Sequence, residues 1–168
     1  MTLSNESTQT PGGHEIKNLA VSLLTEQTTM TLATADENNA WAAPVYYVFL
    51  DSAFYFLSDP KSRHIQESLQ NSQTAASVHA AASTWQAIRG VQMSGRVRQV
   101  AFGREALRVL KAYLAKYPFT REFFPKNSPL DLASFSDRFG VRLYKFIPTL
   151  VYYLDNQIRF AFRTEVKL

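Results

Sequence analysis

The feature that most constrains the fold is a series of short strand-like segments joined by very short polar turns. Residues 28–35, 40–50 and 53–57 follow one another with only a few polar residues between them. Alternating side chains on such segments are typical of strands with one buried face. Connections this short join antiparallel neighbours, because parallel strands need a long crossover. The first part of the chain is therefore predicted to form an antiparallel meander.

Helices interrupt this pattern, and strands resume after them. Apolar residues recur at helical spacing over 14–27 and 102–117, which predicts two amphipathic helices. A regular alternation of strand and helix, as in a parallel sheet, is missing. The best fit is a mainly β, α+β fold, in which a small antiparallel barrel carries peripheral helices. The remaining predicted elements are strands at 74–80, 85–100, 139–147, 150–154 and 157–162, a turn at Asp155-Asn156, and short helical or aromatic turns at 119–125 and 130–135.

The domain organisation follows from length and local composition. Residues 1–13 are rich in Ser, Thr, Asn and Gln and end in Pro-Gly-Gly, which predicts a disordered leader. The remaining residues, 14–168, are predicted to form a single domain, because a chain of this size can build one core.

Composition excludes several classes of function. The chain has no cysteine, so it has no disulfides, thiolate metal ligands or thiol nucleophiles. Apolar runs stay well short of the roughly 18–20 residues that span a bilayer, and the polar N-terminus lacks a signal pattern. We expect a soluble cytoplasmic protein that does not bind membranes. His14, His64 and His79 lack the spacing of metal ligands, so no metal site is predicted.

The charge is modestly basic, with a net value of +4 and arginines concentrated between residues 89 and 108. Such a cluster can form a nucleic-acid-binding face. No nucleic-acid-binding motif accompanies it, and solvated strand and helix faces explain it as well. We therefore expect no nucleic-acid partner.

The clearest candidate site lies where the strand ending at Ser58 runs into a helix. Ser58 or Asp59 can act as N-cap, and Pro60 suits the first helical position. A helix is therefore predicted from Pro60 to Leu69.

The first turn of this helix carries Lys61, Arg63 and His64. Helix N-termini favour acidic side chains, by roughly 0.3–1 kcal/mol each, so these basic residues have the wrong sign. An anion held by the free backbone N–H groups, the Ser58 and Ser62 hydroxyls and the Arg63 guanidinium would reverse that sign. A solvated helix start with its basic side chains in water is the alternative, and polarity alone does not decide between the two.

Two glycines interrupt the predicted strand 85–100. Gly90 and Gly95 lie where a strand residue with a side chain is expected. Glycine inside a strand marks a bulge or the close approach of a ligand or backbone. Bending of the strand to close a barrel explains these positions equally well.

Four motifs, in this order, resemble the FMN-binding split-barrel family typified by pyridoxamine 5′-phosphate oxidase. The resemblance covers most of the chain, from about Thr28 to Phe162. It implies an antiparallel split β-barrel, FMN as cofactor, a small-molecule substrate, and a homodimer with the cofactors at its interface. The motifs are Thr31–Ala35, Ala43–Tyr47, Phe54–Ser58 followed by Ser62-Arg63-His64, and Trp85–Gly95.

The resemblance also implies which residues contact the cofactor. In the family the strand-turn-helix corner holds the FMN phosphate, and the backbone at Pro44–Tyr46 would line the isoalloxazine ring. Gln92 falls near the place from which the partner subunit reaches the flavin. The catalytic residues stay unknown. The full predicted cofactor set is Pro44, Val45, Tyr46, Leu57, Ser58, Lys61, Ser62, Arg63, His64 and Gln92.

The chain departs from the oxidases at several positions. His64 stands where they usually have lysine, and Ala43 where they place a phosphate-binding arginine. Gly90 with Gln92 replaces their glutamine-valine-arginine pattern, and their substrate-gripping arginine and histidine pair is not evident in 160–164. The C-terminal end looks like that of smaller, uncharacterised members of the superfamily.

These departures count against the vitamin substrate more than against the flavin. The sequence therefore predicts an FMN-binding oxidoreductase that acts on an unknown small substrate. Two alternatives stay open: a flavin- or haem-binding protein without turnover, and a structural dimer whose cofactor site has decayed.

Overall fold

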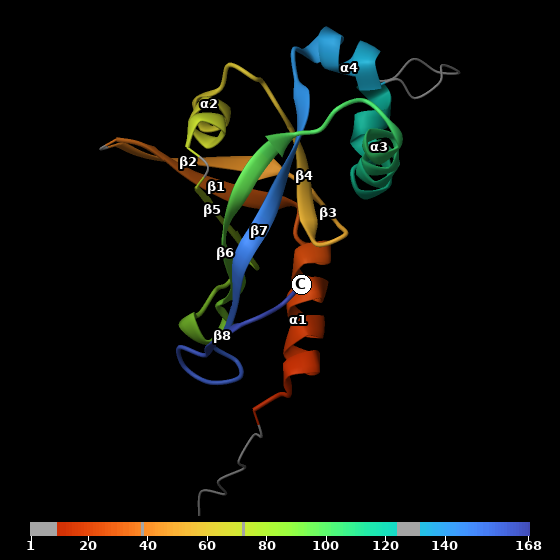
Figure 1. Ribbon diagram of the computed structural model, residues 1–168. Helices are drawn as coiled ribbons and strands as arrows, with labels where there is room; N and C mark the ends of the chain where they lie inside the picture. Colours follow the sequence, from red (N-terminus) through yellow and green to blue (C-terminus); the bar gives the residue numbers. More distant parts are fainter. Residues whose placement is uncertain (1–9, 38, 72, 124–131) are drawn as a thin grey trace, which may run out of the picture.

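One curled antiparallel sheet forms the centre of the computed structural model, which describes residues 10–37, 39–71, 73–123 and 132–168 (Figure 1). The strands are β1 (Thr29–Asp36), β2 (Asn39–Tyr46), β3 (Val48–Leu50), β4 (Ala53–Ser58), β5 (Thr74–His79), β6 (Arg89–Gln99), β7 (Arg142–Asp155) and β8 (Arg163–Glu165). Their order in the sheet is β2-β1-β5-β6-β7-β4-β3, and β8 pairs with β7. The predicted antiparallel, mainly β fold is confirmed.

Both edges of this sheet belong to one continuous piece of chain. β2 pairs with β1 at one edge and β3 pairs with β4 at the other, and Tyr47 alone separates β2 from β3. The sheet therefore has to curl until its two edges approach each other, which produces the split barrel. The Tyr47 ring is fully buried, and its hydroxyl donates to the carbonyl of Leu24 over 2.7 Å. The predicted single strand 40–50 is thus wrong at Tyr47, where the chain bends.

Helices close the inside of the curl and cover part of its outside. They are α1 (Gly13–Glu26), α2 (Arg63–Gln70), α3 (Arg104–Lys116) and α4 (Leu132–Phe139), with short 3-10 turns η1 (Trp85–Ala87) and η2 (Pro118–Phe123). α1 and α2 lie toward opposite ends of the sheet in Figure 1. No helix in the described part of the chain is long and apolar enough to cross a membrane.

The inner face of the sheet carries the main core. Phe54 and Phe56 of β4 lie opposite Phe146 and Tyr144 of β7, and all four side chains are fully buried. α2 adds Ile65 to the same cluster, and α1 adds its apolar face. Burial of each such side chain contributes roughly 1.5–3 kcal/mol, so this cluster stabilises the curl.

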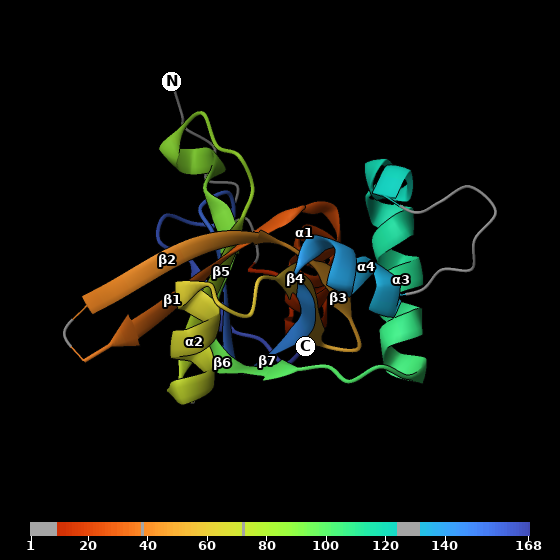
Figure 2. The ribbon, with the colours of Figure 1, turned by 90° about the horizontal axis from the view of Figure 1, so that it is seen from above.

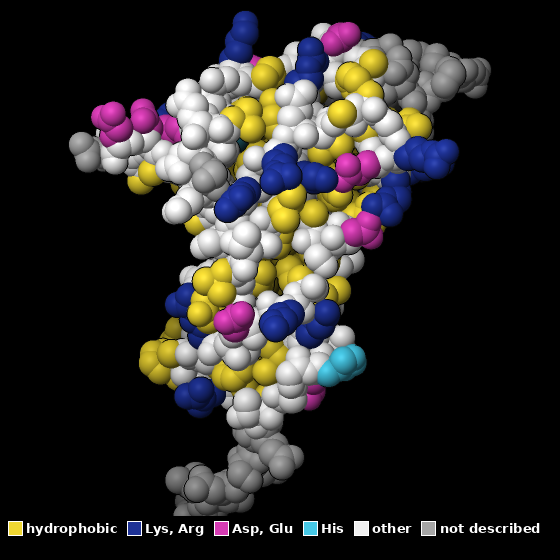
Figure 3. Space-filling model, in the orientation of Figure 1, with side chains coloured by type: hydrophobic (Ala, Val, Ile, Leu, Met, Phe, Trp, Pro, Cys, Tyr) yellow, Lys and Arg dark blue, Asp and Glu magenta, His cyan; other side chains and the backbone are white. Residues whose placement is uncertain are grey.

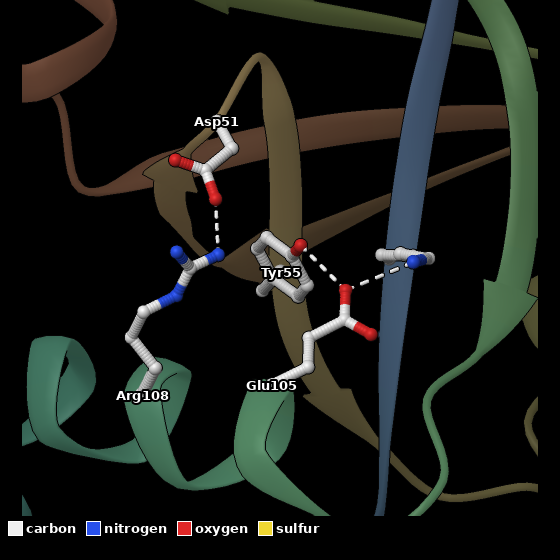
Figure 4. Close-up of polar contacts among 5 residues, drawn as sticks. Asp51, Tyr55, Glu105 and Arg108 are labelled. Atoms are coloured by element: carbon white, nitrogen blue, oxygen red, sulfur yellow. Dashed lines mark hydrogen bonds and ion pairs between the residues drawn. The ribbon is translucent and has the colours of Figure 1, made fainter.

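α3 covers the outer face of β3, β4 and β7 and leaves the outside of β1, β5 and β6 open (Figure 2). Polar contacts fix the start of this helix (Figure 4). One carboxylate oxygen of Glu105 accepts hydrogen bonds from the Tyr55 hydroxyl at 2.8 Å and from the Lys145 ammonium at 2.9 Å. Arg108 pairs with Asp51 in the β3–β4 turn. Burial and the Glu105 carboxylate raise the pKa of Tyr55 to about 12, so the hydroxyl stays a donor at neutral pH.

The C-terminal strands differ from the prediction. Predicted strands 139–147 and 150–154 form one strand of 14 residues, β7. It runs through Pro148 because that residue lies opposite Gly95, where the register shifts and no regular ladder bond is required.

The predicted strand 157–162 is wrong, and the turn predicted at Asp155-Asn156 is longer. Residues 156–162 form turns because two side chains bind backbone N–H groups that a strand would use. The carboxylate of Asp155 accepts from Gln157, and the amide oxygen of Asn156 accepts from Ala161. The last strand, β8, follows this loop.

The ends of the other helices and strands differ less from the predicted ones. The predicted helices 14–27 and 102–117 are α1 and α3, and the predicted strand 85–100 begins with η1 before β6. Of the predicted leader, residues 1–9 lie outside the described residues, and helix α1 already starts at Gly13. Residues 124–125 and 130–131 of the two predicted short turns also lie outside them; the described parts belong to η2 and α4.

Gly95 lies at the bulge between β6 and β7. A Cβ atom at this position would stand 2.3 Å from the Ile147 carbonyl oxygen and 2.7 Å from the Phe146 ring. The close approach that this glycine permits is therefore to the neighbouring strand rather than to a ligand.

Gly95→Ala should lower the free energy of unfolding by about 1–3 kcal/mol, because the added methyl overpacks the core against backbone. Gly13→Ala is the matched control: its Cβ would meet no atom within 4 Å, and alanine in the first turn of a helix is neutral or stabilising by up to about 1 kcal/mol. Urea denaturation measures both. Equal free energies of unfolding for the two variants would contradict the close packing at Gly95.

Candidate functional site

The candidate site lies at the corner between β4 and α2. The helix begins at Arg63 rather than at Pro60 as predicted, and it ends at Gln70. A turn replaces the predicted first residues because Asp59 binds the chain that follows it. Its carboxylate accepts the N–H of Lys61 at 2.8 Å, and its carbonyl accepts the N–H of Ser62 at 3.0 Å. Ser62 thereby becomes the N-cap residue.

The start of α2 has no side-chain cap. Ser62 makes no capping hydrogen bond, because its hydroxyl donates to the carbonyl of Asp59 at 2.7 Å. The first N–H groups of a helix have no partner within the helix and carry partial positive charge. No acidic residue lies in the first turn of α2. The helix start therefore presents hydrogen-bond donors.

Two hydroxyls and an imidazole meet at the same corner. The Ser58 Oγ lies 2.9 Å from the Nε2 of His64 and 3.3 Å from the Oγ of Ser62. The Ser62 Oγ lies 3.4 Å from the same His64 nitrogen. Burial lowers the pKa of His64 below 6.5, and the charge of Glu67 only partly opposes this effect. The imidazole is therefore mainly neutral near pH 7.

A network that sequence reasoning missed holds Arg63 in place. The Nε of Arg63 donates to a carboxylate oxygen of Glu67 at 2.5 Å, and the guanidinium lies over the Trp41 ring at 4.9 Å. The other Glu67 oxygen accepts from the Thr34 hydroxyl. Only the i,i+4 spacing of Arg63 and Glu67 signalled part of this network; nothing in the sequence pointed to Thr34.

The donor set suits a phosphate group. Among the described residues the hydrogen bond and ion pair of Arg63 use its Nε, and the side chain is 43% exposed, so the terminal guanidinium nitrogens can reach a ligand. The hydroxyls of Ser58 and Ser62 and the uncapped N–H groups of α2 belong to the same corner. The Glu67 carboxylate, which contacts this fork, is occupied by Thr34 and Arg63. A phosphate would meet donors here, as at other helix N-termini.

Two of the predicted corner residues do not present side chains to this site. Leu57 packs against the α3 cluster on the outer face of the sheet. Lys61 is exposed in the turn, where its backbone N–H binds Asp59. The structure brings the side chains of Ser58, Ser62 and His64 into contact, whereas the side chain of Arg63 contacts Glu67 and Trp41.

The predicted ring-lining residues lie on the edge strand β2. Pro44 pairs with Thr31, Val45 is buried in the core, and the Tyr46 side chain is 52% exposed. Trp41, which contacts Arg63, lies three residues before Pro44, or about 10 Å along the strand. Val45 can therefore contact a ligand only through its backbone, as the resemblance implies.

Gln92 lies far from the corner of its own chain. It sits opposite Ser77 and Tyr152 on the open outer face of the sheet, in a hollow of about 360 Å³. Along β6 it is seven residues, or about 23 Å, from Gln99. Gln99 pairs with Tyr144 of β7, which in turn pairs with Phe56 of β4, close to the corner. Within a single chain, Gln92 therefore cannot contact a ligand bound at the corner.

Small residues line this open face. A second hollow, of about 710 Å³, adjoins the first and extends it toward the end of α2. Thr31, Ala33, Ala75 and Ser94 form much of the surface. The outward positions of β1 and β5 carry this signal in the sequence, as small residues that alternate with buried ones.

On the face shown in Figure 3 a group of basic side chains lies together at the centre, and acidic side chains lie near several of the others. Lys145 pairs with Glu105, and Arg108 pairs with Asp51. His14 and His79 are exposed. No group of three metal-ligating side chains occurs among the described residues.

Comparison with known proteins gives concordant results. The family model for pyridoxamine 5′-phosphate oxidase matches residues 16–144. The UPF0306 protein YhbP of Salmonella paratyphi C is 36% identical over 100 residues, which cover 58% of this chain and 67% of that protein. A FAD-binding protein of Mesorhizobium loti has a TM-score of 0.60 at 18% identity, with 80% of this chain and 90% of that chain covered. A heme binding protein of Mycobacterium smegmatis has a TM-score of 0.67 at 14% identity, with 94% and 58% covered. The two solved structures share the fold.

Thr34→Val should raise the pKa of Glu67, because the Thr34 hydrogen bond is the largest cause of its lowered value. A carboxylate whose pKa is lowered in the folded state stabilises the fold at any pH above its pKa in the unfolded chain, which is about 4.5. This stabilisation is lost as the pH falls through the lowered pKa. Acid unfolding of Thr34→Val should therefore begin at higher pH. Thr34→Ser keeps the hydroxyl and should behave like the parent in an NMR titration of the Glu67 carboxyl; a raised pKa in both variants would contradict the assignment.

Proposed function

Because the chain belongs to the pyridoxamine 5′-phosphate oxidase family, we propose that it binds FMN and acts as an oxidoreductase on a small substrate. The observation that carries the proposal is the corner at the start of α2. There Ser58, Ser62 and His64 contact one another beside the uncapped start of α2, and Arg63 is the first residue of that helix. These groups would hold the phosphate of the cofactor.

The corner supplies both charge and direction to a bound phosphate. Arg63 is the cation with free N–H groups, and Glu67 and Trp41 fix the plane of its guanidinium. A guanidinium held in this way loses less conformational entropy when it binds an oxyanion. The helix N–H groups add fixed dipoles that require no side-chain movement.

The edge strand β2 offers backbone groups to the flavin ring. In the described sheet β2 pairs only with β1, so the backbone groups on its other side lack a strand partner. Bound flavin supplies the redox chemistry, and the chain supplies binding and orientation. The Tyr46 carbonyl is already bound to the Tyr113 hydroxyl at 2.5 Å, which fixes one end of this segment.

We further propose a homodimer formed through the open outer face. The small residues of β1, β5 and β6 make a surface that a second copy can approach closely. Gln92 lies on this surface and not at its own corner, so it would reach the cofactor of the partner chain. The resemblance to the family supports the same arrangement.

The substrate and the cytoplasmic location stay predictions. The absence of an arginine at Ala43 argues against pyridoxamine 5′-phosphate itself. The shared fold with a heme binding protein makes haem the second candidate ligand, without turnover. Visible absorption separates the two candidates, because flavin and haem have different spectra.

Arg63→Ala should weaken FMN binding by about 10- to 100-fold, because it removes charge-assisted hydrogen bonds worth roughly 1.5–3 kcal/mol. Riboflavin lacks the phosphate and should bind the variant and the parent almost equally. Arg104→Ala removes an exposed arginine on α3 and serves as the charge control. Flavin fluorescence quenching measures each Kd, and an unchanged FMN affinity in Arg63→Ala would disprove the phosphate assignment.

Ser94→Arg should separate the dimer, because it places a long charged side chain in the middle of the open face. Leu107→Arg alters an exposed position on α3 and should leave the dimer intact. Analytical ultracentrifugation measures both. A Ser94→Arg variant that sediments as a dimer would show that the subunits meet elsewhere.

A further inference from the structure

We infer that His64 is a proton-linked ligand of the cofactor phosphate, so that this chain binds FMN more tightly as the pH falls through the range in which His64 titrates. The inference rests on the proposed function and adds a regulation of the same site. It concerns the position at which the oxidases usually carry a lysine, whose charge does not change near neutral pH.

The geometry places the imidazole against both hydroxyls of the donor set. The Nε2 of His64 lies 2.9 Å from the Ser58 Oγ and 3.4 Å from the Ser62 Oγ. A phosphate oxygen hydrogen-bonded to Ser58 therefore lies at most about 5.7 Å from this nitrogen, which is two consecutive hydrogen bonds. Opposite charges within about 4–6 Å favour the charged form of a group.

The other charged groups around the corner largely cancel one another. On α2, Arg63 pairs with Glu67. The turn before α2 carries Asp59 and Lys61, one charge of each sign. His64 is therefore the group whose charge can change to match a phosphate.

The neighbouring strand β7 adds no free acid to the corner. Arg142 lies opposite Ser58 and pairs with Asp137 at 3.3 Å. Tyr144 has a raised pKa because of burial, so it stays neutral near pH 7. Neither group places an unpaired negative charge beside His64.

The direction of the pH dependence follows from linkage. Without phosphate, burial keeps the pKa of His64 below 6.5, so the ring is mainly neutral above that pH. A bound phosphate opposes this effect and raises the pKa. Between the two values the complex holds one more proton than the free protein, so the Kd for FMN rises with pH, by at most about tenfold per pH unit.

Two variants isolate this effect from the titration of the phosphate itself, whose second pKa is about 6. His64→Lys keeps a positive charge throughout, and His64→Gln keeps a polar side chain that does not titrate. The Kd for FMN is measured between pH 6.5 and 8.5 for the parent and both variants. We expect the parent to lose about 5- to 50-fold in affinity over this range, and both variants to change by less than about twofold.

Proton uptake gives a second readout that does not depend on turnover. Calorimetric titration with FMN at pH 7, in two buffers of different ionisation enthalpy, counts the protons taken up on binding. We expect a fraction of a proton for the parent, and none for His64→Lys or for riboflavin binding to the parent. If one variant fails to fold, the other and the parent still provide the comparison.

The outcomes separate this inference from the proposed function. A parallel pH dependence in the parent and both variants, or no proton uptake by the parent, would overturn the role of His64 and leave FMN binding in place. Equal affinities of the parent for FMN and riboflavin at every pH would instead overturn the phosphate corner itself.

Discussion

The whole structure depends on one covalent constraint, the continuity of β2 and β3 through Tyr47. Because this run of chain forms both edges of the sheet, the sheet cannot lie open, and its inner face closes around the aromatic core. The end of α3 and the residue after it clamp the bend. The Tyr117 hydroxyl lies 2.6 Å from the Tyr47 carbonyl and 2.8 Å from the Thr28 carbonyl, and Lys116 donates to the carbonyl of Gln27 at 2.6 Å. The curl in turn places α2 against β1 and β2, where Thr34 binds Glu67 and Trp41 contacts Arg63.

The corner shows how a charged group can be both held and available. Glu67 binds the Nε of Arg63 and Trp41 lies against the guanidinium, while the side chain stays 43% exposed. Replacement of the usual lysine by His64 makes the remaining charge of the site conditional on pH. On the proposed function, the affinity of this corner for a flavin phosphate would therefore change with pH, without any change of fold.

Much of the fold could be predicted because strand alternation and helical spacing are local signals. The antiparallel sheet, α1, α3 and the corner follow from them, and the resemblance supplied the closure of the barrel. The errors arose where side chains bind nearby backbone. Asp59 turns the chain before α2 and delays the helix, and Asp155 with Asn156 makes a loop of the expected strand 157–162. Contacts over long sequence distances, such as Thr34 with Glu67, leave no local signal. The distance between Gln92 and the corner likewise depends on the sheet register.

The most direct test of the central claim, that the corner binds the phosphate of FMN, combines the visible spectrum of the purified protein with its thermal melt in the presence of FMN or riboflavin. The account predicts a flavin spectrum that survives gel filtration after FMN is added. It also predicts a melting temperature that rises with FMN concentration, as expected for a ligand that binds only the native state, and rises less with riboflavin. A haem spectrum, or the absence of both bound flavin and stabilisation by FMN, would contradict it.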